Sequence, residues 1–144
     1  MGQLGGAALA ATLYDKMALT HLNLWSNKIG SVAISALADA LHHNSTLKGI
    51  QLAFNKVGDD GTISLAKMLC CNTGLKTLQL AGNEIESAGA TALGEAHNAT
   101  LQELNLHSNN ARDKGANTFA DALAHNTTAC SYKTTTFQTM VESP

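Results

Sequence analysis

The sequence repeats one leucine pattern four times. The copy that begins at Leu75 reads L-x-x-L-x-L-x-x-N-x-I and ends at Ile85. The other copies begin at Leu19, Leu47 and Leu101, so that successive copies start 28, 28 and 26 residues apart. Self-similarity at a fixed period in this range is typical of a solenoid, in which stacked units bury a continuous core that no single unit could bury alone. This periodicity constrains the fold more than any other feature of the chain.

Each copy also carries an asparagine three residues after its last leucine. A buried amide can donate to and accept from backbone groups that a turn leaves unpaired, in its own repeat and in the adjacent one. A polar residue at a fixed core position therefore has a structural reason to be there. We expect a structural asparagine ladder formed by Asn27, Asn55, Asn83 and Asn109.

Each repeat divides into a predicted strand and a predicted helix. Leucines alternate from Leu19 to Leu24, as in a strand with one buried face, and apolar residues then recur at helical spacing. An asparagine follows each helix, and we expect a left-handed or turn conformation at Asn44. The third repeat is two residues short before Asn98, which predicts a shorter helix. We interpret the small residue at each helix start as close approach to the strand layer; these residues are Ala33, Gly61, Gly89 and Gly115.

The chain is predicted to form a single domain over residues 1–144. The terminal repeats of a solenoid need caps, because each has a neighbour on one side only. Residues 1–18 hold a helix that we interpret as an N-terminal cap or half-repeat, and a poorly capped end would allow self-association. The pattern fails after Thr128, so we expect a degenerate C-terminal cap and tail at 129–144. The repeats themselves are 19–46, 47–74, 75–100 and 101–128.

The pattern resembles the leucine-rich repeat. The stretch N-K-V-G-D-D-G-T-I-S-L-A-K-M-L-C-C-N-T-G-L-K-T-L-Q-L looks like the ribonuclease-inhibitor type, which occurs in ribonuclease inhibitor, in NOD-like receptors and in the activator of the Ran GTPase. The resemblance implies an α/β fold, a right-handed β-α solenoid that forms a short horseshoe arc, with parallel strands on the concave face and helices on the convex face. Helices about 8–10 Å apart, outside strands about 4.8 Å apart, would force this curvature.

The resemblance is specific for fold and much less so for function. The chain has no G-x-x-x-x-G-K-[ST] motif and no acidic tail of the kind found in Ran GTPase activators. We expect a non-catalytic protein–protein interaction module that binds a protein or peptide on its concave sheet face. Two alternatives stay open: a regulator of a small GTPase, and a ligand-sensing fragment of a larger NOD-like receptor-type or effector protein.

Side chains that alternate with the buried leucines should face solvent on the concave side. One such column is uniform in amides, which offer both donors and acceptors to a partner. Trp25 and Phe54 are the large aromatic residues of this face, expected on adjacent strands, where they could equally anchor a ligand or pack on each other. The predicted protein-binding residues are His21, Asn23, Trp25, Gln51, Phe54, Thr77, Gln79, Glu103, Asn105 and His107.

Other function classes find little support in the sequence. The net charge is −2 and Arg112 is the single arginine, so we expect no nucleic-acid partner. No nucleophile elbow or other triad signature appears, and we predict neither an enzyme nor catalytic residues. Helix-diameter spacing keeps one His/Cys column from converging on a metal, so we expect no metal and no cofactor. That column is His43, Cys71, His97 and His125.

Composition also bears on location. No stretch approaches the roughly 18 apolar residues of a membrane span, and 1–13 lacks the basic start of a secretory leader. The three cysteines are sparse, and two of them, Cys70 and Cys71, are adjacent. Such a set fits free thiols in a reducing compartment better than a disulfide framework. We therefore expect a cytoplasmic protein without membrane contact.

Overall fold

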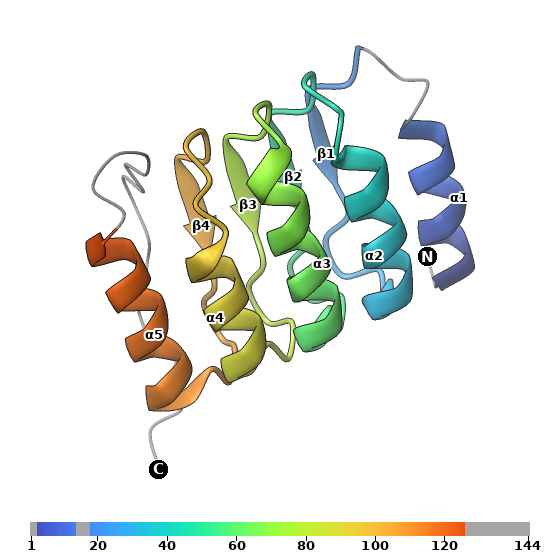
Figure 1. The fold of residues 1–144 in the computed structure, drawn as a ribbon. Helices are drawn as coiled ribbons and strands as arrows, with labels where there is room; N and C mark the ends of the chain where they lie inside the picture. Colours follow the sequence, from blue (N-terminus) through green and yellow to red (C-terminus); the bar gives the residue numbers. More distant parts are fainter. Residues whose placement is uncertain (1–2, 14–17, 126–144) are drawn as a thin grey trace.

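The computed structural model of the 144-residue chain describes residues 3–13 and 18–125. An N-terminal helix is followed by four strand–helix units (Figure 1). The predicted C-terminal cap at 129–144 lies outside the described residues. In chain order the elements are α1 (Gln3–Leu13), β1 (His21–Asn23), α2 (Gly30–Leu41), β2 (Gly49–Gln51), α3 (Gly58–Cys71), β3 (Thr77–Gln79), α4 (Ser87–Glu95), β4 (Glu103–Asn105) and α5 (Arg112–His125).

The strands form one parallel sheet in the order β1-β2-β3-β4. Its register joins equivalent repeat positions, so that Ile50 lies between Leu22 and Leu78. Leu78 in turn pairs with Leu104. The strands line one side of the molecule and the helices stack along the other (Figure 1). The prediction of an α/β solenoid with parallel strands is confirmed.

The apolar core lies between the sheet and the helices. The central strand residues Ile50, Leu78 and Leu104 are at most 2% exposed, and helix residues such as Leu37 reach the same burial. Leu22, on the edge strand β1, is only half-buried. Burying one such side chain stabilises the fold by about 1.5–3 kcal/mol. The buried leucines of the repeat pattern therefore supply much of the driving force for stacking.

Small residues at the helix starts let neighbouring helices approach one another. A Cβ at Gly115 on α5 would lie 2.7 Å from the Cα of Ser87 on α4. A Cβ at Gly61 on α3 would lie 3.3 Å from the Cα of Ser31 on α2. The expectation that these glycines approach the strand layer is thus wrong. They set the spacing between helices, because a side chain at Gly61 or Gly115 would press on the backbone of the preceding helix.

Helix α4 is capped from the preceding repeat. At 9 residues it is shorter than α2, α3 and α5, which have 12, 14 and 14, as the deletion in the third repeat predicts. Oδ1 of Asp59, on α3, accepts hydrogen bonds from the backbone N–H groups of Glu86 at 2.8 Å and Gly89 at 2.9 Å. A carboxylate at this end of a helix also suits the helix dipole. Asp59 therefore ties α3 to α4.

Asparagine side chains link the turns that follow the strands. The buried Asn55 accepts hydrogen bonds at Oδ1 from the backbone N–H groups of Asn27 at 3.0 Å and Ile29 at 3.3 Å. Its Nδ2 donates to the carbonyl of Leu24 at 2.7 Å. Each of these bonds crosses to the preceding repeat. The same arrangement recurs one and two repeats later, at Asn83 and Asn109.

A second set of asparagines does the same at the C-terminal ends of the helices. Nδ2 of Asn72 donates to the carbonyls of Leu41 at 2.7 Å and Asn44 at 2.8 Å, and its Oδ1 accepts from the N–H of Leu75 at 2.8 Å. Asn98 is bonded in the same way. Of the two conformations expected at Asn44, the left-handed one is absent, because its φ is not positive, and the turn is present. Side-chain hydrogen bonds close this turn instead.

Candidate functional site

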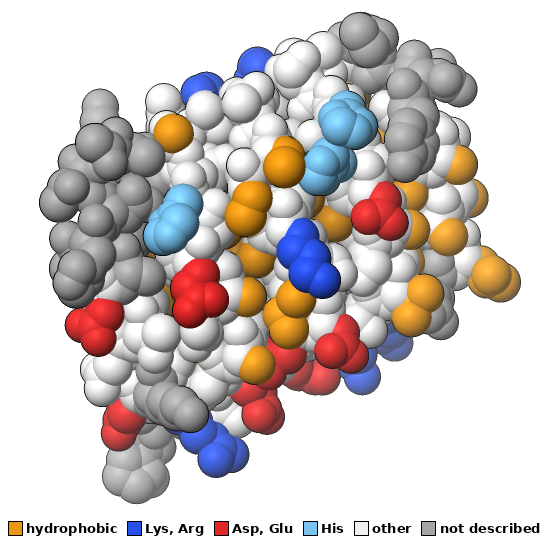
Figure 2. Space-filling model, in the orientation of Figure 1, with side chains coloured by type: hydrophobic (Ala, Val, Ile, Leu, Met, Phe, Trp, Pro, Cys, Tyr) orange, Lys and Arg blue, Asp and Glu red, His pale blue; other side chains and the backbone are white. Residues whose placement is uncertain are grey.

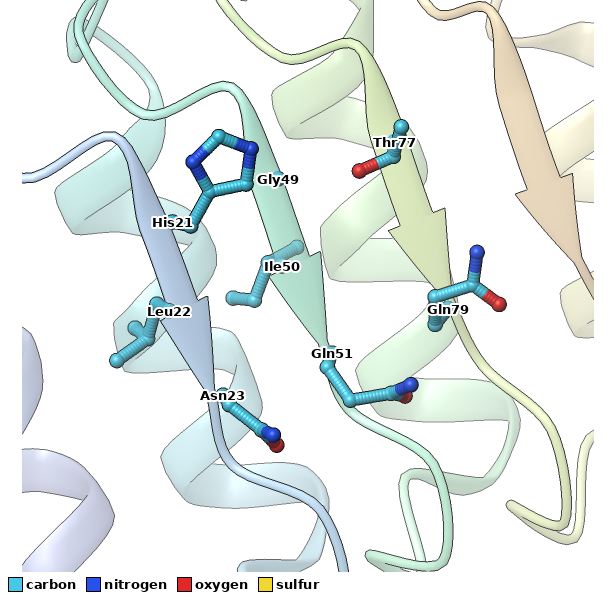
Figure 3. Close-up of a pocket in the computed structure, with 8 residues that line it drawn as sticks. All are labelled: His21, Leu22, Asn23, Gly49, Ile50, Gln51, Thr77 and Gln79. Atoms are coloured by element: carbon cyan, nitrogen blue, oxygen red, sulfur yellow. The ribbon is translucent and has the colours of Figure 1, made fainter.

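Outward side chains of the four strands lie in rows across the sheet. The first row is His21, Gly49, Thr77 and Glu103, and the second is Asn23, Gln51, Gln79 and Asn105. Figure 3 shows both rows over the first three strands. Gly49 lets the side chains on either side of it in the first row come close, since a Cβ there would lie 2.7 Å from both His21 Cδ2 and Thr77 Oγ1. The face is hollowed at this point, with a volume of about 220 Å³.

In three of the four residues of the amide row, the backbone engages the side-chain oxygen. The side-chain oxygens of Asn23, Gln51 and Asn105 each accept a hydrogen bond from the backbone N–H two residues later, at 2.9–3.0 Å. Their amide nitrogens make no hydrogen bond within the part of the chain that the structure describes. Gln79 differs, because its Nε2 donates to Oε1 of Glu103 at 2.6 Å. What the row offers a partner is therefore narrower than the sequence predicts.

Trp25 and Phe54 form an exposed aromatic pair at one end of the sheet. They lie in the turns after β1 and β2, not on the strands as expected. The ring centroids are 6.2 Å apart at an interplanar angle of 81°, an edge-to-face contact. The side chains still remain 57% and 51% exposed. Mutual packing and ligand contact are therefore compatible for this pair.

The backbone around the aromatic pair is fixed by hydrogen bonds. The N–H of Trp25 donates to Oδ1 of Asn23 at 3.0 Å, and its carbonyl accepts from Nδ2 of Asn27 at 3.1 Å. The N–H of Phe54 donates to the carbonyl of Ala81 in the next repeat at 2.9 Å. Both rings are thus presented from backbone that is held before any ligand arrives.

Phe54 occupies the left-handed backbone conformation that recurs at this position in all four repeats. Its φ is +58°, and the equivalent residues Ser26, Gly82 and Ser108 have φ values of +54°, +62° and +54°. A left-handed conformation costs a residue with a Cβ about 1–2 kcal/mol. The Phe54 ring lies against the backbone of Gly82, where a Cβ would collide with it. Glycine at 82 therefore makes room for the aromatic pair.

The remaining predicted residues differ in exposure. Glu103 and His107 are exposed and Thr77 is half-buried. Ala53, which was expected to face solvent beside Trp25, is only 4% exposed.

Two exposed lysines lie in the same turns as the aromatic pair, and the strand pattern did not predict them. Lys28 and Lys56 follow the aromatic residues in the turns after β1 and β2, with φ values of +53° and +59°. Glu84 stands at the equivalent position of the third repeat, with φ +59°. The alternation of side chains along a strand does not predict where side chains in a turn point. The one sequence signal for these lysines is that each directly follows an asparagine of the ladder.

The helical side of the molecule has a different character. Its hydrophobic side chains lie scattered among polar and charged ones (Figure 2). A hollow of about 550 Å³ runs over the short, small-residue helix α4, between Ile63 of α3 and Thr118 of α5. Within residues 3–13 and 18–125, no three His, Cys, Asp or Glu side chains are grouped to hold a metal ion. None of the described helices is long and apolar enough to cross a membrane.

Comparison with known proteins agrees with this architecture. Residues 17–38, 43–66, 71–94 and 97–120, more than half of the chain, match a family profile described as Leucine Rich repeat. The solved structure of Leiomodin-1 Actin-Binding Site 2 is similar, with a TM-score of 0.75, 26% identity, and coverage of 87% of this chain and 74% of that chain. The tropomodulin C-terminal domain of Caenorhabditis elegans is similar in fold, with a TM-score of 0.70, 13% identity, and coverage of 81% and 77%. No curated protein matches in sequence.

Proposed function

Because the chain belongs to the leucine-rich repeat family, we propose that it is a non-catalytic interaction module whose sheet face binds a protein or peptide. The proposal assigns the contact to the two rows and the aromatic pair, and it treats residues 1–144 as one domain. The single observation that carries it is the exposed Trp25–Phe54 pair on hydrogen-bonded backbone. Large aromatic side chains held rigidly before binding lose little conformational entropy when a ligand docks.

The test is capture of a partner by the wild-type protein and by Trp25→Ala. Alanine already stands at the two equivalent positions, Ala53 and Ala81, so the turn accepts it. We expect the substitution to weaken binding at least tenfold, as for a hot-spot tryptophan, while the circular dichroism spectrum and the midpoint of unfolding stay close to wild type. A partner bound equally well by both proteins would contradict the proposal.

Actin is a specific candidate partner. The similar leiomodin-1 structure is that of an actin-binding site, and the similarity covers most of this chain at 26% identity. Cosedimentation with filamentous actin, and gel filtration with monomeric actin, test this directly. Binding that Trp25→Ala weakens would identify actin as a ligand of the sheet face. Binding that the variant leaves unchanged would place actin elsewhere on the protein.

Regulation of a small GTPase is the alternative with a catalytic readout. A regulator accelerates nucleotide hydrolysis at substoichiometric amounts, whereas a binding module does not. We expect no acceleration, since the single arginine of the chain, Arg112, begins α5 and lies apart from the sheet rows. Turnover enhanced by catalytic amounts of this protein would replace the proposed function with the alternative.

A further inference from the structure

The first two repeats share a surface chemistry that the third and fourth lack. In each of the first two turns an aromatic residue precedes an exposed lysine: Trp25 with Lys28, and Phe54 with Lys56. The matching turn of the third repeat carries Ala81, Gly82 and Glu84, and that of the fourth carries His107, Ser108 and Asn110. We call Asn23, Trp25, Lys28, Gln51, Phe54 and Lys56 the basic aromatic surface.

The cations of this surface have no partner among the described residues. Neither Lys28 nor Lys56 makes a hydrogen bond or an ion pair there, and both side chains are exposed. Lys48, in contrast, donates from Nζ to the carbonyl of Ser45 at 2.6 Å. The two ammonium groups are therefore free to meet carboxylates of a ligand.

The amides of the surface point to the same kind of ligand. Asn23 and Gln51 lie at the carboxyl ends of β1 and β2 (Figure 3), and their oxygens are already bonded to backbone N–H groups at 3.0 Å. Both NH₂ groups are left for a partner, and they donate. Lysines and amides together present donors and positive charge, so a complementary partner supplies acceptors and negative charge.

Acidic side chains restrict where such a partner can lie. Glu84 replaces the lysine in the third repeat, and Glu103 at the far strand accepts the hydrogen bond from Gln79. A segment rich in carboxylates would meet like charge there, which is unfavourable. The same segment is attracted over the first two repeats, so the charge pattern fixes its position along the array.

Phe54 is the bulky residue among the four equivalent left-handed turn positions. Serine or glycine fills the equivalent left-handed positions at 26, 82 and 108. A bulky residue there costs stability without burying its ring, which is 51% exposed. The conformation belongs to the repeat turn, so what sets Phe54 apart is a large ring left half exposed beside Trp25.

We propose that the basic aromatic surface binds an acidic peptide segment in which an aliphatic or aromatic side chain is flanked by carboxylates. The apolar side chain packs on the Trp25–Phe54 pair, and the carboxylates face Lys28 and Lys56. The amide NH₂ groups of Asn23 and Gln51 donate to the carbonyls or carboxylates of the segment. The inference rests on the proposed function and specifies the chemistry of its ligand.

A displayed library of random peptides, each about ten residues long and so about 33 Å when extended, tests the inference on the full chain. The most enriched peptide is then synthesised with a fluorophore, and its affinity is measured by anisotropy. We expect enrichment of Asp and Glu beside Leu, Ile or Phe. Lys28→Glu and Lys56→Glu should each weaken the affinity about tenfold, and rising salt should weaken it further.

Matched variants separate charge from fold. Glutamate has the same left-handed conformation at Glu84, so it is tolerated at positions 28 and 56. Lys67→Glu changes the net charge equally, but at an exposed position on α3, and should leave the affinity unchanged. Equal weakening by Lys67→Glu and Lys56→Glu would overturn the inference, because long-range charge alone would then explain it.

The remaining outcomes distinguish the inference from the proposed function. Enrichment of neutral or basic peptides whose binding is weakened by Trp25→Ala would overturn the inference and leave the proposed function standing. If neither Trp25→Ala nor the lysine variants changed the affinity for the enriched peptides, both the inference and the proposed function would be overturned. A selection that yields no enriched peptide would overturn the inference. Binding of polyuridylate RNA or of phosphatidylserine vesicles that depends on the lysines and not on Trp25 would also overturn it.

Discussion

At the scale of single residues, Asn55 illustrates how much one buried amide can hold. Its side chain accepts hydrogen bonds from the backbone N–H groups of Asn27 and Ile29 and donates one to the carbonyl of Leu24, all in the preceding repeat. We expect Asn55→Ala to destabilise the protein by about 3 kcal/mol, because buried backbone groups would lose their partners. Denaturant unfolding with an unchanged m-value measures this loss.

The matched control is Asn23→Ala. Asn23 is exposed, and its side chain makes one hydrogen bond, to the N–H of Trp25. That N–H can turn to water, so we expect a loss of no more than about 1 kcal/mol. If the two variants lowered the midpoint equally, burial of the ladder would not be the source of its stability.

The sequence predicts which residues lie inward but not how their polar neighbours are oriented. The leucine period placed Leu22, Ile50, Leu78 and Leu104 side by side, because a parallel register follows from equal repeat lengths. It could not show that the oxygens of the amide row are bonded within their own turns. That orientation depends on turn geometry, which a pattern of residue types does not specify.

At the scale of elements, Asp59 makes the start of α4 depend on α3. We expect Asp59→Ala to destabilise the protein by about 1–2 kcal/mol, as for the loss of a helix cap, since the N–H groups of Glu86 and Gly89 would lose their acceptor. Asp60→Ala is the matched control, because this adjacent carboxylate is exposed and makes no side-chain bond among the described residues. A comparable loss in both variants would refute the capping role.

The relative lengths of the helices could be predicted from the sequence, but the contacts between helices could not. The deletion before Asn98 correctly predicted a short α4. The partner of each small helix-start residue was assigned to the wrong layer, since Gly115 meets the backbone of Ser87 on the neighbouring helix. The distance between adjacent helices depends on tertiary packing, which the repeat pattern does not specify. The same distance decides whether Asp59 can reach α4.

At the scale of the whole molecule, α1 covers the end of the stack. A Cβ at Gly6 would lie 2.6 Å from the Cβ of Ala33, so α1 sits directly on α2, and its residues Ala10 and Leu13 are buried. Removing residues 1–18 would expose the apolar face of α2. We expect the truncated protein to unfold at a lower denaturant concentration and to self-associate, because a solenoid needs its terminal cap.

Light scattering coupled to gel filtration measures this association. Leu4→Glu in the full chain is the control, since Leu4 is 89% exposed and points away from the stack. It should remain in the wild-type association state with little change in stability. A truncated protein that stays as stable and as dispersed as the wild type would show that α1 is not a cap.

Each described helix and strand contacts only its immediate neighbours in the stack. No tertiary contact between described elements closes the first repeat onto the fourth, so cohesion accumulates link by link along the array. A force that draws the two ends apart would accordingly meet a series of small barriers in place of one large one. Such an array would lengthen in steps, each one repeat long, and could regain them singly when the tension falls.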